Sequence, residues 1–124
     1  MLGSRELAQL AARAAEDKKA QDILILDMRE LTLVCDYLLL SSGGSPPQIR
    51  AIADHVKDRL AAAGFILLRR EGYAVGRWVL LDYGDLIVHV FHPHERSFYA
   101  LERLWGDAPV LRPADGEVLL AHNA

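Results

Sequence analysis

The chain has 124 residues, with 14 lysines and arginines against 17 aspartates and glutamates, for a formal net charge of −3. This length predicts one domain, and 52% hydrophobic residues favour a globular chain over a disordered one. Because no lysine or arginine block is present, little direct nucleic-acid binding is expected, and a basic protein partner suits the charge better. The sequence predicts neither a membrane-spanning segment nor an apolar signal sequence, so we expect a cytoplasmic protein.

The first half of the chain predicts a helix, two strands and a second helix. Ser4 is expected to cap the first helix, which runs to about Lys18 with the apolar stripe Leu7, Leu10, Ala11 and Ala14. Short apolar strands follow at 23–26 and 37–40. The single cysteine, Cys35, lies in the apolar run 33–35 and is expected to be a buried thiol.

The second helix has a specific start signal. Ser45 is an expected N-cap, Pro46 takes the first helical position, and Gln48 completes a capping box. The helix is expected to end near Gly64.

The second half predicts three more strands and a helix. A strand is expected at 65–68, a hairpin at 78–91, and a last helix from about Pro93 or His94 to about Trp105. The order α-β-β-α-β-β-β-α predicts an α/β fold, a mixed sheet of about five strands with helices mainly on one face. We expect residues 1–106 to form the domain, and 107–124 a tail that is loosely packed or forms a short extra element.

The hairpin is the most informative feature. Two apolar runs flank the turn Asp82-Tyr83-Gly84-Asp85, where Gly84 is free to adopt positive φ. The turn is expected to lift Tyr83 and two carboxylates to the tip, with Trp78 lower on one strand. Aromatic and acidic residues on a rigid ribbon indicate a docking surface.

Three groups of residues offer alternative chemistry. The sequence Gly43-Gly44-Ser45 before a helix suits a phosphate site or a capped turn, and it is too short for a P-loop. Three histidines, at 89, 92 and 94, are candidates for a metal site, but their spacing is not that of a reliable metal-binding motif, and Pro93 forces a turn between two of them. A structural or surface role is favoured for each. Acids border the strands, and turn and loop roles are favoured over a magnesium site for Asp27, Asp36, Asp82 and Asp85.

Five segments, taken together, resemble the ribosomal silencing factor family, also called Iojap-like proteins. They cover about Leu7 to Trp105 and keep the family's order and approximate spacing. The matching residues are Glu16-Asp17-Lys18-Lys19-Ala20-Gln21-Asp22-Ile23 with Leu26-Asp27; Asp36-Tyr37 with Ser42-Gly43-Gly44-Ser45 and Gln48; Ala51-Ile52-Ala53-Asp54; Glu71-Gly72 with Trp78 and Asp82-Tyr83-Gly84-Asp85; and Val88-His89-Val90-Phe91 with Arg96, Tyr99, Leu101-Glu102 and Leu104-Trp105.

This resemblance implies a fold related to nucleotidyltransferases and binding to the large ribosomal subunit through its fourteenth protein. It further implies that joining of the small subunit is blocked, that translation falls under nutrient limitation or in stationary phase, and that the free protein forms a homodimer. The catalytic nucleotidyltransferases related to this fold carry paired acids on the strand after a Gly-Ser motif, whereas the strand expected at 65–68 has no acidic residue. No metal clamp for phosphoryl transfer is therefore expected.

These observations favour a steric anti-association factor that needs no cofactor, metal or catalytic residue. The residues expected to contact the partner are Trp78, Asp82, Tyr83, Asp85, Arg96 and Tyr99. The alternative is a nucleotide- or metal-dependent enzyme built on residues 43–45 or on the histidines.

Overall fold

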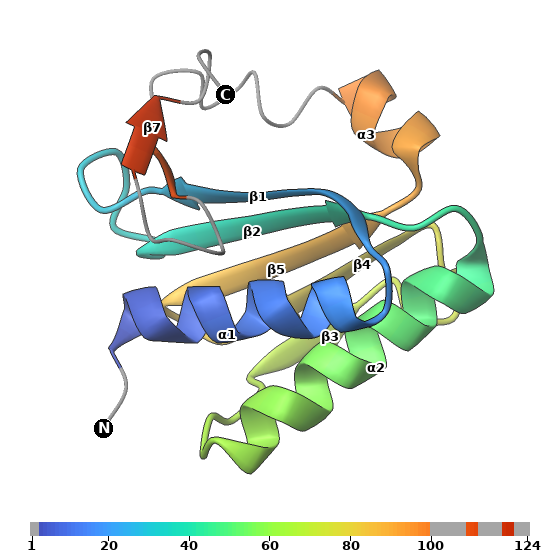
Figure 1. Ribbon diagram of the computed structural model, residues 1–124, viewed down its shortest axis with the longest axis horizontal. Coiled ribbons are helices and arrows are strands. Elements are labelled where there is room, and N and C mark those ends of the chain that lie inside the picture. The colour runs from blue at the N-terminus through green and yellow to red at the C-terminus, as the bar shows by residue number, and fades with distance from the viewer. Residues whose placement is uncertain (1–2, 100–108, 112–117, 121–124) are drawn as a thin grey trace.

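A computed structural model describes residues 3–99, 109–111 and 118–120. These described residues form three helices and seven strands. Figure 1 shows how they are arranged. Their bounds are α1 Ser4–Asp17, β1 Gln21–Asp27, β2 Tyr37–Ser42, α2 Pro46–Ala62, β3 Arg69–Glu71, β4 Trp78–Asp82, β5 Leu86–Phe91, α3 Pro93–Tyr99, β6 Pro109–Leu111 and β7 Val118–Leu120.

The strands form one mixed sheet in the order β3-β4-β5-β2-β1-β6-β7. Only β2 and β5 pair in parallel, and the other neighbours are antiparallel. The predicted α/β class and mixed sheet are confirmed. The tail adds two strands to the five expected, since β6 pairs with β1 and places residues 109–111 in the sheet.

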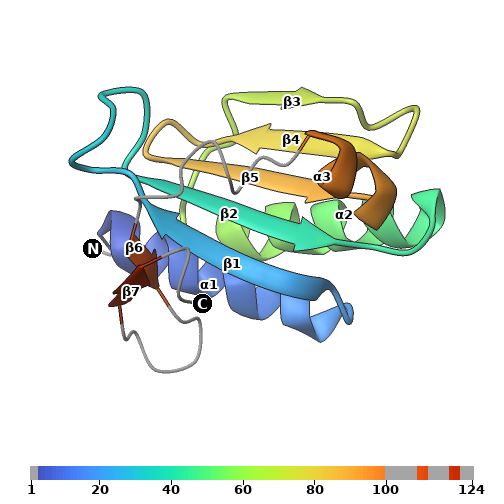
Figure 2. The same cartoon turned by 90° about the horizontal axis from the view of Figure 1, so that it is seen from above.

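Helices α1 and α2 cover one face of the sheet, whereas the short α3 lies on the opposite side, as Figures 1 and 2 show. Five alanines of α1, at 8, 11, 12, 14 and 15, are fully buried and let this helix approach the strands closely. The main core lies between these helices and the side chains of Ile25, Leu39, Val79, Leu81, Val88 and Val90.

The opposite face of the sheet carries a second, smaller apolar cluster. It contains Leu26, Met28, Cys35, Leu38, Leu40 and Phe91, with Leu24, Trp78 and Ile87 packed against it. Cys35 is buried as expected, and burial raises the pKa of its thiol to about 11. The thiol therefore stays protonated at neutral pH.

Two local predictions were wrong. Ser4 is the first residue of α1, whose N-cap is Gly3, and it makes no side-chain capping bond. The segment 65–68 is not a strand: pairing with β4 begins in β3, where Arg69 lies opposite Asp82. Leu68 makes only a first backbone bond, from its N–H to Asp82 O at 2.8 Å. The strand is displaced because β4 ends at Asp82 and offers residues 65–67 no further partner.

Candidate partner-binding surface

Five half-buried side chains lie on the face of the β4–β5 hairpin that points away from α1 and α2. Because successive residues of a strand point to opposite faces, β4 and β5 place on this side Trp78, Leu80, Asp82, Ile87 and His89. We call these five residues the outer hairpin face. They form one patch because Leu80 lies opposite His89 and Asp82 lies opposite Ile87.

Trp78 is held in one orientation. Its indole Nε1–H donates a 3.0 Å hydrogen bond to His89 Nδ1, and its ring centroid lies 5.5 Å from that of Phe91. Burial lowers the pKa of His89 to about 4, so the imidazole is neutral at physiological pH. Since the indole has only a donor, Nδ1 must be the accepting nitrogen. The outer hairpin face therefore presents a fixed aromatic group, which loses little side-chain freedom on binding.

The turn after β4 is built by Asp82 and Gly84. Gly84 has φ of +83°, a conformation that favours glycine, and its N–H donates a 2.8 Å bond to Asp82 Oδ1. The other carboxylate oxygen of Asp82 lies 3.8 Å from Arg69 Nη2. Asp85 is exposed, and its backbone carbonyl accepts bonds from the amides of Asp36 and Tyr37. Asp82 thus braces the turn, while Asp85 presents its carboxylate to solvent.

The prediction that Tyr83 is displayed at the hairpin tip was wrong. Its side chain is 9% exposed and packs in the main core on the same side as Val79 and Leu81. The alternation of β4 continues through residue 83 and turns the ring toward the helices. Within the described part of the chain the phenol oxygen has no hydrogen-bond partner, and burial raises its pKa to about 12. Tyr83 therefore packs in the core on the helix side of the hairpin and stabilises the turn.

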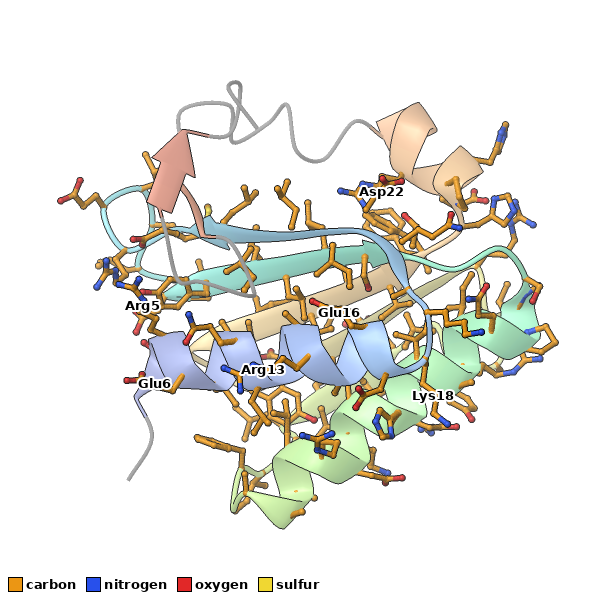
Figure 3. All side chains as sticks on the ribbon, viewed as in Figure 1. Arg5, Glu6, Arg13, Glu16, Lys18 and Asp22 are labelled. Atoms are coloured by element: carbon orange, nitrogen blue, oxygen red, sulfur yellow. The ribbon has the colours of Figure 1, made fainter. Side chains whose placement is uncertain are left out.

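Arg96 was also expected to contact a partner, but the structure buries it. Its Nη1 donates to Asp22 O at 2.6 Å and to Ser42 Oγ at 3.1 Å. Figure 3 shows Asp22 in the space between the sheet and α3. Arg96 thus fixes α3 beside the Trp78 end of the outer hairpin face. Tyr99 ends α3, and its side chain lies outside the described residues.

The glycines before α2 form a capped turn. A Cβ on Gly43 would lie 2.9 Å from Ile49 Cγ1, so this glycine permits close packing of the turn on the helix. Ser45 Oγ accepts from Gln48 N at 3.3 Å, and Gln48 Oε1 accepts from Gly44 N at 2.7 Å. The predicted N-cap at Ser45 is confirmed. The capping box is modified, because Gln48 accepts from the amide of Gly44, one residue before the cap. It occupies two amides that a phosphate at this helix start would need.

The histidines and acids have structural partners. His92 Nδ1 accepts from His94 N, and Asp27 accepts from the backbone and side chain of Arg29, which holds the pKa of Asp27 below its usual range. Over the residues the structure describes, no three His, Cys, Asp or Glu side chains gather as a metal site. The strand that does form, β3, carries Glu71, so the expectation of an acid-free strand is corrected. Glu71 is exposed and paired with Arg69 at 3.1 Å.

One exposed feature was missed by the sequence reasoning. The loop 28–36 between β1 and β2 exposes Leu31, Leu33 and Val34. The apolar run 33–35 suggested burial, but only Cys35 faces inward. One sequence signal could have indicated an exposed loop. The apolar run lies between Asp27 and Asp36, in a segment that shows neither helical nor strand periodicity.

Within the described ranges, no helix is long and apolar enough to cross a membrane.

A family model for "Ribosomal silencing factor during starvation" matches residues 2–123. The ribosomal silencing factor RsfS of Bacillus subtilis is 48% identical over 88% of this chain and 92% of its own. The chloroplastic protein Iojap of Zea mays is 35% identical over 84% of this chain and 46% of its own.

Two solved structures share the fold. A protein from Chromobacterium violaceum superposes with a TM-score of 0.83 at 39% identity, covering 85% of this chain and 88% of the other. A protein from Bacillus halodurans gives a TM-score of 0.77 at 44% identity, with 86% and 97% of the two chains covered. The family model, which matches residues 2–123, includes the segments that form β6 and β7.

Proposed function

Because the chain belongs to the ribosomal silencing factor family, we propose that it binds the large ribosomal subunit through the fourteenth protein of that subunit. There it blocks joining of the small subunit by occupying space and represses translation under nutrient limitation or in stationary phase. We further propose that it works in the cytoplasm and is a homodimer when free.

The observation that carries this proposal is the outer hairpin face. A rigid indole and two aliphatic side chains, Leu80 and Ile87, lie half-buried on a sheet surface that α1 and α2 leave uncovered. Buried aromatic anchors commonly dominate the energy of protein interfaces. The five residues of β4 span roughly 17 Å, which fits within a standard interface of about 800 Å² per partner.

Charge favours a basic protein as the partner. Asp85 is exposed at the turn, Asp82 lies on the outer hairpin face, and the chain as a whole is acidic. Carboxylates at the border of an apolar patch speed encounter with a basic surface and disfavour nucleic-acid phosphates. We propose Trp78 as the main anchor and Asp82 and Asp85 as the residues that guide binding. Tyr83 and Arg96 position these elements from within, and Tyr99 remains a predicted contact.

The mechanism needs affinity and position but no bond chemistry. A protein that covers the surface where the subunits meet prevents their association by exclusion alone. The alternative, a nucleotide- or metal-dependent enzyme, finds no support at residues 43–45, where Ser45 and Gln48 already bond the helix-start amides.

Co-sedimentation with separated ribosomal subunits tests the proposal. The untagged protein is mixed with purified large or small subunits without added nucleotide and centrifuged through sucrose. We expect it to pellet with large subunits at one copy each and to stay in the supernatant with small subunits. Binding that requires a nucleotide, or no binding to the large subunit, would contradict the proposal.

A further inference from the structure

The loop 28–36 displays three aliphatic side chains to solvent. Leu33 is 104% exposed and Val34 73% exposed, and Leu31 is exposed beside them. Single exposed apolar residues are common on protein surfaces, but a group of neighbouring ones indicates a contact site. This group lies outside the outer hairpin face, and neither the core nor the turn uses it.

The loop is held in shape, although its tip is exposed. Its two ends are anchored by Met28 and Cys35, both buried, and Met28 N donates a 2.8 Å bond to Asp36 O. Within the loop, Thr32 N donates to Met28 O at 3.1 Å, and Thr32 Oγ1 accepts from Val34 N at 3.1 Å. A segment restrained in this way pays little conformational entropy when it docks.

The loop adjoins the turn of the hairpin. Asp85 O accepts from Asp36 N at 2.8 Å and from Tyr37 N at 3.0 Å, and these bonds join the end of the loop to the turn. Figure 2 shows the β1–β2 loop and the β4–β5 turn side by side at one end of the sheet. The loop that carries the exposed aliphatic residues therefore adjoins the turn that ends the outer hairpin face.

The charges around the loop indicate the class of occupant. Two acidic residues, Glu30 and Asp36, belong to the loop itself, and the exposed Asp85 is joined to Asp36 through its backbone. Arg29 is neutralised by Asp27 at 2.7 Å, and Arg5 at the start of α1 also lies close enough to lower the pKa of Asp27. Acidic groups outnumber basic ones, which disfavours RNA phosphates and suits a basic protein surface with an apolar depression.

We propose that Leu33 and Val34, supported by Leu31, form a second anchor that inserts into an apolar depression on the basic ribosomal protein bound by the outer hairpin face. This inference rests on the proposed function, and it extends the contact from the sheet surface to the β1–β2 loop. The loop and the outer hairpin face would then both contact the same partner protein, on either side of the turn at 82–85.

The test is equilibrium binding of the full chain to purified large subunits, with a matched control. Leu33→Ser/Val34→Ser removes the exposed aliphatic groups. Val75→Ser changes a valine whose exposure, 71%, is close to that of Val34, and it lies in the β3–β4 loop, where Arg50 Nη1 donates to Ala74 O beside α2. All three proteins are expected to keep the same melting temperature, because these side chains contribute little to the core.

We expect the double variant to bind large subunits about tenfold or more weakly than the unmodified protein and the Val75→Ser variant to bind equally. Equal binding by the double variant, while the unmodified protein binds, would overturn this inference alone. Failure of the unmodified protein to bind would overturn the proposed function and this inference with it.

Two further variants distinguish a basic protein surface from RNA as the partner of the loop. Against a basic protein surface, Leu33→Lys should weaken binding more than Leu33→Glu. The reverse order would show that the loop faces RNA and would overturn the proposal. Light scattering on the double variant checks for a second copy of the chain as the occupant. Loss of a dimer with unchanged ribosome binding would likewise overturn it.

Discussion

The indole Nε1 of Trp78 donates a 3.0 Å hydrogen bond to Nδ1 of His89 across the β4–β5 pair. This bond ties the orientation of the proposed main anchor to the protonation state of the half-buried His89 imidazole. A protonated His89 carries a hydrogen on both ring nitrogens and cannot accept from the indole. The geometry of the outer hairpin face therefore depends on a neutral His89.

The stability of the protein should fall in mildly acidic solution because of His89. Its folded-state pKa, about 4, lies below the unfolded value of 6.5, so between these values the unfolded chain takes up a proton that the folded chain does not. Stability is then lost as pH falls from about 6.5 to about 4, with a slope of up to ~1.4 kcal/mol per pH unit from this residue.

Chemical denaturation at several pH values checks this dependence. His89→Asn keeps a polar side chain near the indole and should flatten the slope, whereas His94→Asn, which changes an exposed histidine, should leave it unchanged. Equal slopes in the unmodified protein and in His89→Asn would show that the imidazole is not held neutral.

Truncation of Trp78 should weaken ribosome binding. We expect Trp78→Ala to lose about 2 kcal/mol or more of binding free energy to large subunits, as central aromatic residues often do. The measurement is titration of labelled protein with purified subunits, alongside a melting curve that verifies folding. Tyr73→Ala is the matched control, because Tyr73 lies on the helix side, where its hydroxyl donates to Asp54 at 2.7 Å. A loss as large for Tyr73→Ala as for Trp78→Ala would remove the outer hairpin face from the interface.

Two substitutions of Tyr83 should affect stability very differently. Tyr83→Phe removes a buried hydroxyl that has no partner among the described residues, so the variant should be as stable as the unmodified protein or more stable. Tyr83→Ala should cost about 3–5 kcal/mol, as expected for a large side chain removed from a core. Urea denaturation gives both values, and a neutral Tyr83→Ala would contradict the observed packing.

The cap of α2 should contribute measurably to stability. Ser45→Ala removes the oxygen that accepts from Gln48 N and should cost on the order of 1 kcal/mol. Ser4→Ala is the control, because Ser4 begins α1 without a capping bond, and its free energy of unfolding should change by less than about 0.5 kcal/mol. If both variants lost a similar free energy of unfolding, the hydrogen bond of Ser45 would make no specific contribution to stability.

The sequence predicted correctly those elements that have a recognisable start signal or a regular pattern of apolar residues. Ser45, Pro46 and Gln48 marked the start of α2, and the two apolar runs with Gly84 between them marked the hairpin. Features that depend on neighbours in space were not predictable in this way. The segment 65–68 has strand-like residues, but the register of β3 with β4 leaves it unpaired.

The sequence predicted where some side chains of the candidate site lie, but not others. Trp78 lies on the outer hairpin face because strand alternation directs it away from Val79 and Leu81. Tyr83 was misplaced because a turn residue was assumed to point outward, whereas α2 and the sheet provide a core beneath it. Leu33 and Val34 were missed because an apolar run was taken as buried, and only the fold shows that the loop leaves the sheet.

The central claim is that the protein silences ribosomes by exclusion, and a subunit-joining assay tests it most directly. Purified large subunits are incubated with the untagged protein, small subunits are added without further nucleotide, and joined ribosomes are measured by light scattering. The account predicts that joining falls in proportion to the large subunits occupied and that Trp78→Ala restores it. Undiminished joining at full occupancy of the large subunits would contradict the account.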